Sequence, residues 1–400
     1  MHMGKSITLT IRNHTGRSKG DFIIMPHGLM SPATRNPSIW GKVNASLVPK
    51  EILCSDQFKF SKESTDGKAP EYLSAFFKFQ QSDFKTFAEY AGMNLAFCFG
   101  EKTSYNCPSR LDIDEPSIQQ ALSEISHNDT IGSTVFSMLG DNERLFSLAL
   151  IYGKEADLHD VNDYTSIIDN FFYYKMRNSI DEIKGDQEQI KRDFLKQYLF
   201  RDAFGDVDFS LRNSGIIYND ETKEANIAGH FDFGEMFGVL YASKLTKPEL
   251  TDINVLPEYM RNNPKFVEPI ENGNKLKLEK YNMSPYDLGL NFHTYGNDSI
   301  NNIKYISKEY PDVLLEFLTK LRNFRKSNYL EMIIKESSGD EIRQLLTPQE
   351  QRYVIEYLNG KLDGYEKTLV EELQNSPRKI FVKKHEKEIL GEDEKEQENS

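Results

Sequence analysis

The chain has 400 residues, of which 38% are hydrophobic and 28% charged, as in a water-soluble globular protein long enough for two lobes. Its net charge of −13 argues against sequence-independent binding of nucleic acid, which requires Lys and Arg to neutralise phosphates. The three cysteines are irregularly spaced, which indicates reduced thiols in a cytoplasmic protein rather than a zinc site. No apolar run approaches the roughly 20 residues of a membrane span, so no membrane crossing is expected.

Residues 1–54 are predicted to form a β-rich N-terminal extension or a part of the first lobe. The segment "ITLTI" at 7–11 alternates, and "DFIIM" at 21–25 is a short apolar run. The first ten residues lack the apolar core of a signal peptide. The single tryptophan, Trp40, is expected to anchor the core, because an indole ring buries a large area, and the alternative is that it stacks on a ligand.

The segment "LSAFFKFQ" at 73–80 is predicted to be a strand with Lys78 on one face. Its other face carries Leu73, Ala75, Phe77 and Phe79. The next segment, 82–97, has helical spacing of apolar residues, with Ser82 as N-cap and Glu89 within the helix. A nucleotide phosphate needs a cation, so Lys78 is the candidate and Glu89 its ion-pair partner. The alternative is that both are solvated, as most Lys and Glu side chains are.

The loop "SKESTDGK" at 61–68 precedes this strand, where a loop that covers phosphate would lie. It offers Ser64 and Thr65 for phosphate contact. It contains one glycine, so it is not a GxGxxG loop, and the alternative is a flexible hairpin tip.

The predicted elements change from strands to helices along the chain. Strands at 132–139 and 144–153 are followed by helices at 161–180 and 187–204 and by a mainly helical region at 282–375. In that region Thr347, Pro348 and Glu350 have the spacing of a helix N-cap, a first helical position and a capping box. A mostly β half followed by a mostly α half predicts an α+β fold with a cleft between two lobes.

The predicted domain boundaries follow from this order of elements. Residues 55–153 are assigned to the first lobe and the connection between lobes, and 154–375 to a helical second lobe. Residues 376–400 are rich in charge and are expected to form a disordered tail.

Three oxygen-bearing side chains occur close together in "GDVDFSLRNSGIIYNDETKEANIAGHFDFG", residues 205–234. Asp208 and Asn213 lie in a predicted loop after a long helix. A strand at 214–218, a turn at 219–224 and a returning strand at 225–231 then lead to Asp232. A helix, a loop and a β-hairpin would thus bring two acids and an amide to one place.

Phosphoryl transfer requires such a set of residues. The transferring phosphate carries spread negative charge, so the protein positions groups and supplies cationic charge, often with Mg²⁺ held by oxygen ligands. One Asp can accept the proton of the attacking hydroxyl, while an Asn and a second Asp bind metal. The alternative is that Asp, Asn and Gly are here only as turn formers.

These segments resemble HipA-like serine/threonine protein kinases. "FGDVDFSLRNSGIIY" followed by "AGHFDFGEMF" is similar to their catalytic segment, which has a Gly-Asn-x-Asp loop, an Asn five residues beyond that Asp, a hairpin and an Asp-x-Gly-like metal motif. "FFKFQQ" followed by "FAEYAG" is similar to the family's strand lysine and the helix after it. The resemblance covers roughly residues 55–370.

The resemblance implies a bilobed kinase of the phosphatidylinositol-kinase-like branch that uses ATP and Mg²⁺. It implies that Asp208 is the catalytic aspartate and that Asn213 and Asp232 bind magnesium. Lys78 would contact the ATP phosphates, and Glu89 would be its partner.

The resemblance also implies contacts and roles outside this set. Ile151 and Tyr152 fall where the connection between the lobes would offer backbone groups to adenine. Family members can autophosphorylate in the phosphate loop, where Ser61, Ser64 and Thr65 are the available hydroxyls. By the same likeness the chain would act on a protein substrate as a toxin or effector-type kinase, with an antitoxin or regulatory partner or with delivery into a host cell.

The sequence departs from the family pattern in its catalytic loop. Asp206 replaces the usual Asn before the catalytic Asp, and Phe209 and Ser210 stand where His and Arg are common. These changes leave open that the chain is a pseudokinase or interaction module, which binds nucleotide without turnover. A second alternative to a protein kinase is a lipid or small-molecule kinase of the same fold, because the resemblance implies a branch that shares its core with lipid kinases.

Overall fold

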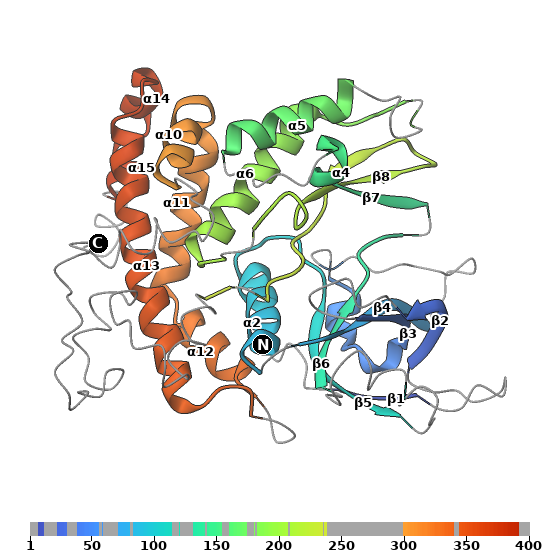
Figure 1. Cartoon of the computed structure of the whole chain (residues 1–400). Coiled ribbons are helices and arrows are strands. Elements are labelled where there is room, and N and C mark those ends of the chain that lie inside the picture. Colours follow the sequence, from blue (N-terminus) through green and yellow to red (C-terminus); the bar gives the residue numbers. More distant parts are fainter. Residues whose placement is uncertain are drawn as a thin grey trace, which may run out of the picture.

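The computed structural model describes residues 7–11, 22–29, 38–55, 58, 71–80, 83–113, 120, 131–140, 142–153, 160–173, 180, 182–206, 209–234, 236–237, 299–339 and 344–391. They form a part built on a six-stranded sheet and a helical part, with one helix between them (Figure 1). The expected site residues Ser61, Ser64, Thr65 and Asp208 and the expected N-cap Ser82 lie outside the described residues.

The larger sheet of the described chain contains six strands. They are β1 (Ile7–Ile11), β2 (Phe22–Leu29), β3 (Ser38–Asn44), β4 (Tyr72–Phe79), β5 (Asn106–Ile113) and β6 (Ile131–Phe136). Their order is β1-β5-β6-β4-β3-β2, and neighbours run antiparallel except β1 and β5, which run parallel. The edge strands β1 and β2 approach each other, so the sheet is curled. A 3₁₀ turn (Ala45–Leu47) and the short helix α1 (Lys50–Leu53) follow β3.

Strand β4 confirms the alternation predicted for this segment. Leu73, Ala75, Phe77 and Phe79 are buried. On the other face Lys78 lies opposite Ser38 of β3 and Ser133 of β6. Because β4 is an inner strand, its backbone is held on both sides and the position of Lys78 is set by the sheet.

Trp40 on β3 corrects one expectation. Its side chain is 39% exposed and its ring lies 4.9 Å from that of Phe76, centroid to centroid. The alternation of β3 buries Ile39 and Val43 and directs Trp40 to the opposite face, so it does not anchor the core.

Helix α2 (Asp83–Cys98) connects the six-stranded sheet to the helical part. It packs against β5 and β6 on one side and against α12 (Tyr329–Ser337) on the other (Figure 1). Its residues 86–96 are all buried, polar ones included, as expected for a helix surrounded by protein.

A smaller sheet lies beyond the six-stranded one. It contains β7 (Glu143–Ser147), β8 (Gly215–Asn219) and β9 (Ala225–Ile227), in that order and antiparallel. The chain therefore changes sheets between Phe136 and Glu143.

Two of the predicted strands are shorter in the structure. The strand predicted at 144–153 ends at Ser147, whose hydroxyl caps the helix α4 (Leu148–Tyr152), and Gly153 ends that helix with φ 73°. The returning strand predicted at 225–231 ends at Ile227. Beyond it the backbone of His230 bonds instead to Lys102 and Ser104, so this segment joins the six-stranded part to the smaller sheet.

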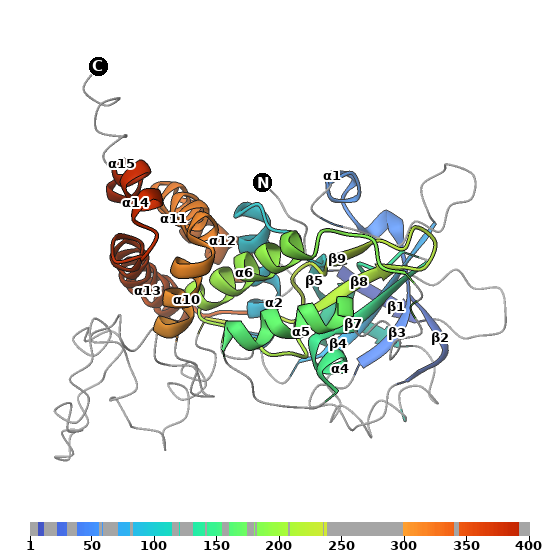
Figure 2. The same cartoon turned by 90° about the horizontal axis from the view of Figure 1, so that it is seen from above.

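In the helical part the first helices lie next to the smaller sheet, and the C-terminal helices lie on one side of the molecule, apart from the sheets (Figure 2). Its main helices are α5 (Val161–Tyr173), α6 (Gln187–Ala203), α10 (Ser299–Glu309), α11 (Pro311–Lys326), α12 and α13 (Pro348–Gln374). The capping box at Thr347 and Glu350 is confirmed at the start of α13. None of the described helices is long and apolar enough to span a bilayer.

The predicted disordered tail is wrong for residues 379–390. They form α14 (Lys379–Lys384) and α15 (Glu386–Leu390), and Ile389 is buried. Arg322 of α11 donates to the carbonyl oxygens of Glu388 and Ile389, and Phe381 and Val382 also pack against the core, so a basic side chain and apolar contacts fix this charged segment. All three cysteines are free, as predicted.

Candidate active site

A buried lysine joins the two sides of the candidate site. Nζ of Lys78, on β4, pairs with Oε1 of Glu89 on α2 and with Oδ1 of Asp232, in the loop after β9. The Lys78 side chain is 9% exposed and that of Glu89 fully buried, whereas that of Asp232 is 40% exposed. Three of the predicted site residues, from a strand, a helix and a distant loop, are thus in direct contact.

The position of Glu89 is fixed by further hydrogen bonds. Its Oε2 accepts the backbone N–H of Phe233 at 2.9 Å, and its Oε1 accepts from the Gln80 amide at 3.3 Å. Asn106 of β5 donates to the main-chain carbonyl of Glu89 at 3.4 Å. Glu89 therefore links α2 to the Asp232 loop as well as to Lys78.

The charge states follow from these contacts. Burial alone would lower the pKa of Lys78, but Asp232 and Glu89 outweigh it, so the pKa lies above its ordinary value and the ammonium stays charged. Burial would raise the pKa of Asp232, but the adjacent Lys78 brings it below its ordinary value. Burial raises the pKa of Glu89, with Lys78 acting in the opposite direction.

The loop that carries Asp232 packs closely on α2. Asp232 itself adopts a left-handed backbone with φ 62°, which costs a non-glycine residue about 1–2 kcal/mol. At Gly92 of α2 an added Cβ would lie 2.7 Å from both Phe233 and Met236, and at Gly234 it would lie 3.3 Å from Glu89. The absence of a side chain at Gly92 thus lets the loop approach the helix.

Sequence reasoning missed Arg201, near the end of α6. Its side chain is fully buried and pairs with Asp206. It also donates to the carbonyl oxygens of Phe231 and Asp232, the latter at 3.0 Å, and its Nε donates to Nδ1 of His230 at 3.2 Å. The signal available in the sequence was the spacing of Arg201 and Asp206, which lie five residues apart, one before and one after Gly205, the glycine that ends the helix.

The other predicted site residues are placed as follows. Asn213 lies in the turn before β8, and β8 pairs antiparallel with β9, so Asn213 and the chain leaving β9 toward Asp232 lie at the same end of the hairpin. Ile151 and Tyr152 lie in α4 rather than in an extended connection. The connection between the two sheets is residues 137–142.

The residues present fit Mg²⁺ by the chemistry of their donors. Asp232 and Asn213 offer carboxylate and amide oxygens, which are the ligands that a hard cation prefers. Within the described residues no group of three or more His, Cys, Asp or Glu could hold a metal ion. His230 is not available as a ligand through Nδ1, which accepts a hydrogen bond from Arg201.

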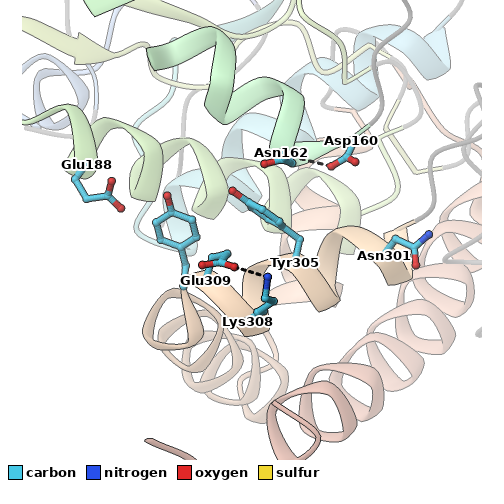
Figure 3. Close-up of a pocket in the computed structure, with 8 residues that line it drawn as sticks. Asp160, Asn162, Glu188, Asn301, Tyr305, Lys308 and Glu309 are labelled. Carbon is cyan, nitrogen blue, oxygen red and sulfur yellow. Dashed lines mark hydrogen bonds and ion pairs between the residues drawn. The ribbon is translucent and has the colours of Figure 1, made fainter. Parts of the chain in front are cut away.

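A separate pocket of about 590 Å³ lies in the helical part, at the beginnings of α5 and α6 and the end of α10 (Figure 3). Acidic side chains and two tyrosine rings line it, among them Asp160, Glu188, Glu309, Tyr305 and Tyr310. None of the predicted site residues contributes to this pocket.

Comparison with known proteins gives a distant likeness only. No family model and no curated protein matches the chain. The crystal structure of the Helicobacter pylori proinflammatory kinase CtkA is similar over 74% of this chain and 91% of its own, with 14% identity and a TM-score of 0.42. HipA, from a Shewanella oneidensis MR-1 toxin–antitoxin complex with HipB and operator DNA, is similar over 88% of this chain and 68% of its own, with 12% identity and a TM-score of 0.38. At these low values the function proposed below depends on the contacts of the site itself.

Proposed function

We propose that the chain is an ATP- and Mg²⁺-dependent phosphotransferase that acts on serine or threonine hydroxyls of a protein. The observation that carries this proposal is the buried Lys78, held between Glu89 and Asp232. A buried ammonium fixed by two carboxylates, one of them partly exposed, suits contact with a phosphate next to a metal ligand.

The charges around the site support binding of a divalent cation. Among the described residues of the site, three carboxylates, Glu89, Asp206 and Asp232, face two cations, Lys78 and Arg201. The remaining negative charge, together with the exposed part of Asp232, favours binding of a further cation there. Bound Mg²⁺ would neutralise charge on the phosphates, and Asp232 and Asn213 are the residues that would hold it.

The proposed reaction is a direct transfer. A bond forms between the acceptor hydroxyl oxygen and the γ-phosphorus, and the bond from that phosphorus to the bridging oxygen of ADP breaks. The hydroxyl proton goes to the Asp208 carboxylate. Lys78 orients the phosphates, and Glu89 holds Lys78 in place. Acceptors include hydroxyls of the chain itself, at Ser61, Ser64 or Thr65.

The test is transfer of labelled phosphate from ATP by the purified chain, alone and with cell extract, followed by phosphosite mapping. Asp208→Ala and Asp232→Ala are expected to lower transfer by at least about 100-fold, because each removes a group that acts on the reacting atoms. Asp220→Ala is the matched control, since Asp220 is an equally exposed aspartate, 43%, paired with Arg144 at the hairpin tip.

The possible outcomes separate the hypotheses. Full activity of a folded Asp208→Ala or Asp232→Ala variant would contradict the proposal. Stabilisation by ATP and Mg²⁺ without any transfer would indicate a pseudokinase, and transfer to lipid vesicles but to no protein would indicate a lipid kinase.

A further inference from the structure

Arg201 lies between the two loops that carry the proposed chemistry. Asp206 and Phe209 stand on either side of Asp208 in the sequence, and the Arg201 guanidinium pairs with Asp206 and lies 5.3 Å from the Phe209 ring centroid. On the side of the Asp232 loop it lies 4.2 Å from the Phe233 ring centroid. One side chain thus contacts both loops through charge and through ring faces.

The hydrogen bonds of Arg201 surround the left-handed residue of the site. The guanidinium donates to the carbonyl oxygens of Phe231 and Asp232, which lie before and after the φ and ψ bonds of Asp232. It also donates to the ring of His230, two residues before Asp232. A left-handed non-glycine backbone persists only where its surroundings hold it. Because Glu89 accepts the N–H of Phe233 from the other side, Arg201 and Glu89 together enclose this segment.

The sequence explains why Arg201 and Asp206 meet. Gly205, with φ 72°, ends α6, and the N–H groups of Gly205 and Asp206 bond to the carbonyls of Asp202 and Arg201 at 3.2 and 2.9 Å. This is the Schellman arrangement, in which the residue after the glycine folds back onto the last turn of the helix. The residue after the glycine often makes an apolar contact with the last turn of the helix, and here Asp206 forms an ion pair with Arg201 instead.

The end of α6 is itself anchored to the helical part. Asp202, next to Arg201, accepts hydrogen bonds from Ser299 of α10 and Tyr365 of α13, each at 3.0 Å. The backbone at Arg201 is therefore held by the helical part, and the guanidinium is held by four hydrogen bonds to the two loops.

We propose that Arg201 is a positioning residue that sets the spacing between the loop of Asp206 and Phe209 and the loop of Asp232, with Asp206 neutralising its charge. This inference rests on the proposed function and assigns a role to two residues, Asp206 and Phe209, that depart from the HipA-like pattern. In this chain both departures are partners of the same buried arginine.

The test compares Arg201→Lys with Arg322→Lys. Lysine keeps the charge but cannot make several fixed contacts at once. Arg322 is a matched control, because it also donates to one carboxylate, that of Glu366, and to two successive carbonyls, those of Glu388 and Ile389. It lies on α11 and contacts neither of the two loops in these bonds.

Two measurements are made on each full-length variant. The first is the Mg²⁺ concentration that half-saturates binding of a non-hydrolysable ATP analogue, with kcat measured alongside. Arg201→Lys is expected to weaken metal binding or kcat by about 10- to 100-fold, as is usual when a residue that holds a metal ligand is changed. Arg322→Lys is expected to change neither by more than about twofold.

The second measurement is amide hydrogen exchange of residues 231–234 in the ligand-free protein. Arg201→Lys is expected to speed exchange of the Phe233 amide relative to wild type, and Arg322→Lys is not. A folded Arg201→Lys variant with unchanged exchange and unchanged Mg²⁺ dependence would overturn the inference.

A second variant covers the case in which Arg201→Lys does not fold. Asp206→Asn keeps the shape and an acceptor oxygen but removes the neutralising charge, and it is expected to raise the half-saturating Mg²⁺ concentration and to speed exchange at 231–234. Unchanged values would overturn the inference. If wild-type protein neither binds nucleotide nor transfers phosphate, the proposed function fails, whereas the exchange experiment still decides whether Arg201 holds the loop.

Discussion

His230 is a buried, neutral imidazole two residues before Asp232. It is 1% exposed, its ring contacts those of Phe200 and Phe233, and its Nδ1 accepts a hydrogen bond from Arg201. The ring proton is therefore on Nε2, which has no hydrogen-bond partner among the described residues. Burial, and after it the nearby Arg201, hold the pKa of His230 well below its ordinary value.

This lowered pKa predicts a loss of stability in mild acid. Below about pH 6.5 the unfolded chain protonates His230 and the folded chain does not, so the unfolded state binds more protons and the free energy of unfolding falls as the pH falls. Between about pH 7.5 and pH 5.5 this should cost wild type about 1 kcal/mol more than His230→Phe. Denaturant unfolding at both pH values measures the difference, and equal losses in the two proteins would contradict the prediction.

The buried ion pairs of Lys78 contribute both to stability and to the proposed chemistry. Removal of the ammonium would leave Glu89 buried and unpaired, and breaking a buried pair costs about 3–5 kcal/mol. Asp232, with its partly exposed side chain, can instead be solvated or bind metal. The same lysine therefore serves stability through Glu89 and the proposed chemistry through Asp232.

Helix α2 determines at the scale of an element how closely the Asp232 loop approaches. The helix carries Glu89 and, one turn later near the same loop, Gly92, where an added Cβ would meet Phe233 and Met236. Helical propensity alone would favour alanine at that position by about 1 kcal/mol. The close approach of the loop therefore opposes the local preference of the helix.

Gly92→Ala is thus expected to destabilise the protein by about 1–3 kcal/mol, because the new methyl group overpacks the contact. It should also reduce phosphate transfer, since the loop must move away from Glu89. Gly140→Ala is the control: its Cβ would lie no closer than 3.5 Å to Glu143, and stability should change by less than about 0.5 kcal/mol. A Gly92→Ala protein that is more stable than wild type would show that the contact is looser than described.

At the scale of the whole molecule, α2 joins the sheet to the C-terminal helices. Asn94 donates to the Ser337 hydroxyl of α12 at 3.0 Å, and both side chains are buried. Lys320 of α11 pairs with Glu101, just beyond α2, at 3.2 Å in a more exposed position. These contacts link the strand lysine, through α2, to helices more than two hundred residues later in the chain.

A double-mutant cycle can measure this link. Asn94→Ala, Ser337→Ala and the double variant should give a coupling energy of about 1 kcal/mol, because a buried hydrogen bond is removed from both sides. The corresponding cycle for Glu101 and Lys320, whose side chain is 34% exposed, should give a coupling energy that decreases with salt, because salt screens an ion pair with a partly exposed partner. Zero coupling between Asn94 and Ser337 would mean that α2 and α12 are held by apolar packing alone.

Much of the site was predictable from local patterns. Alternation identified β4 and the face of Lys78, the helical spacing after it gave α2 and Glu89, and the turn between two apolar runs gave the hairpin before Asp232. The capping box at Thr347 was also predictable, because it depends on residues three apart. Each of these features is decided by neighbours in the sequence.

Other features were decided only by tertiary structure, because they depend on contacts between residues that are far apart in the sequence. Residues 148–152 are apolar enough for a strand but form a helix, and the N–H groups of its first two residues bond to the carbonyls of Ser214 and Leu211. The charged segment 379–390 becomes ordered where Arg322 donates to its carbonyls. The contacts of Lys78 with Asp232, and of Arg201 with the Asp232 loop, join residues 154 and about 30 positions apart. Local spacing therefore determined most of the candidate side chains, and packing determined which of them meet and brought in Arg201.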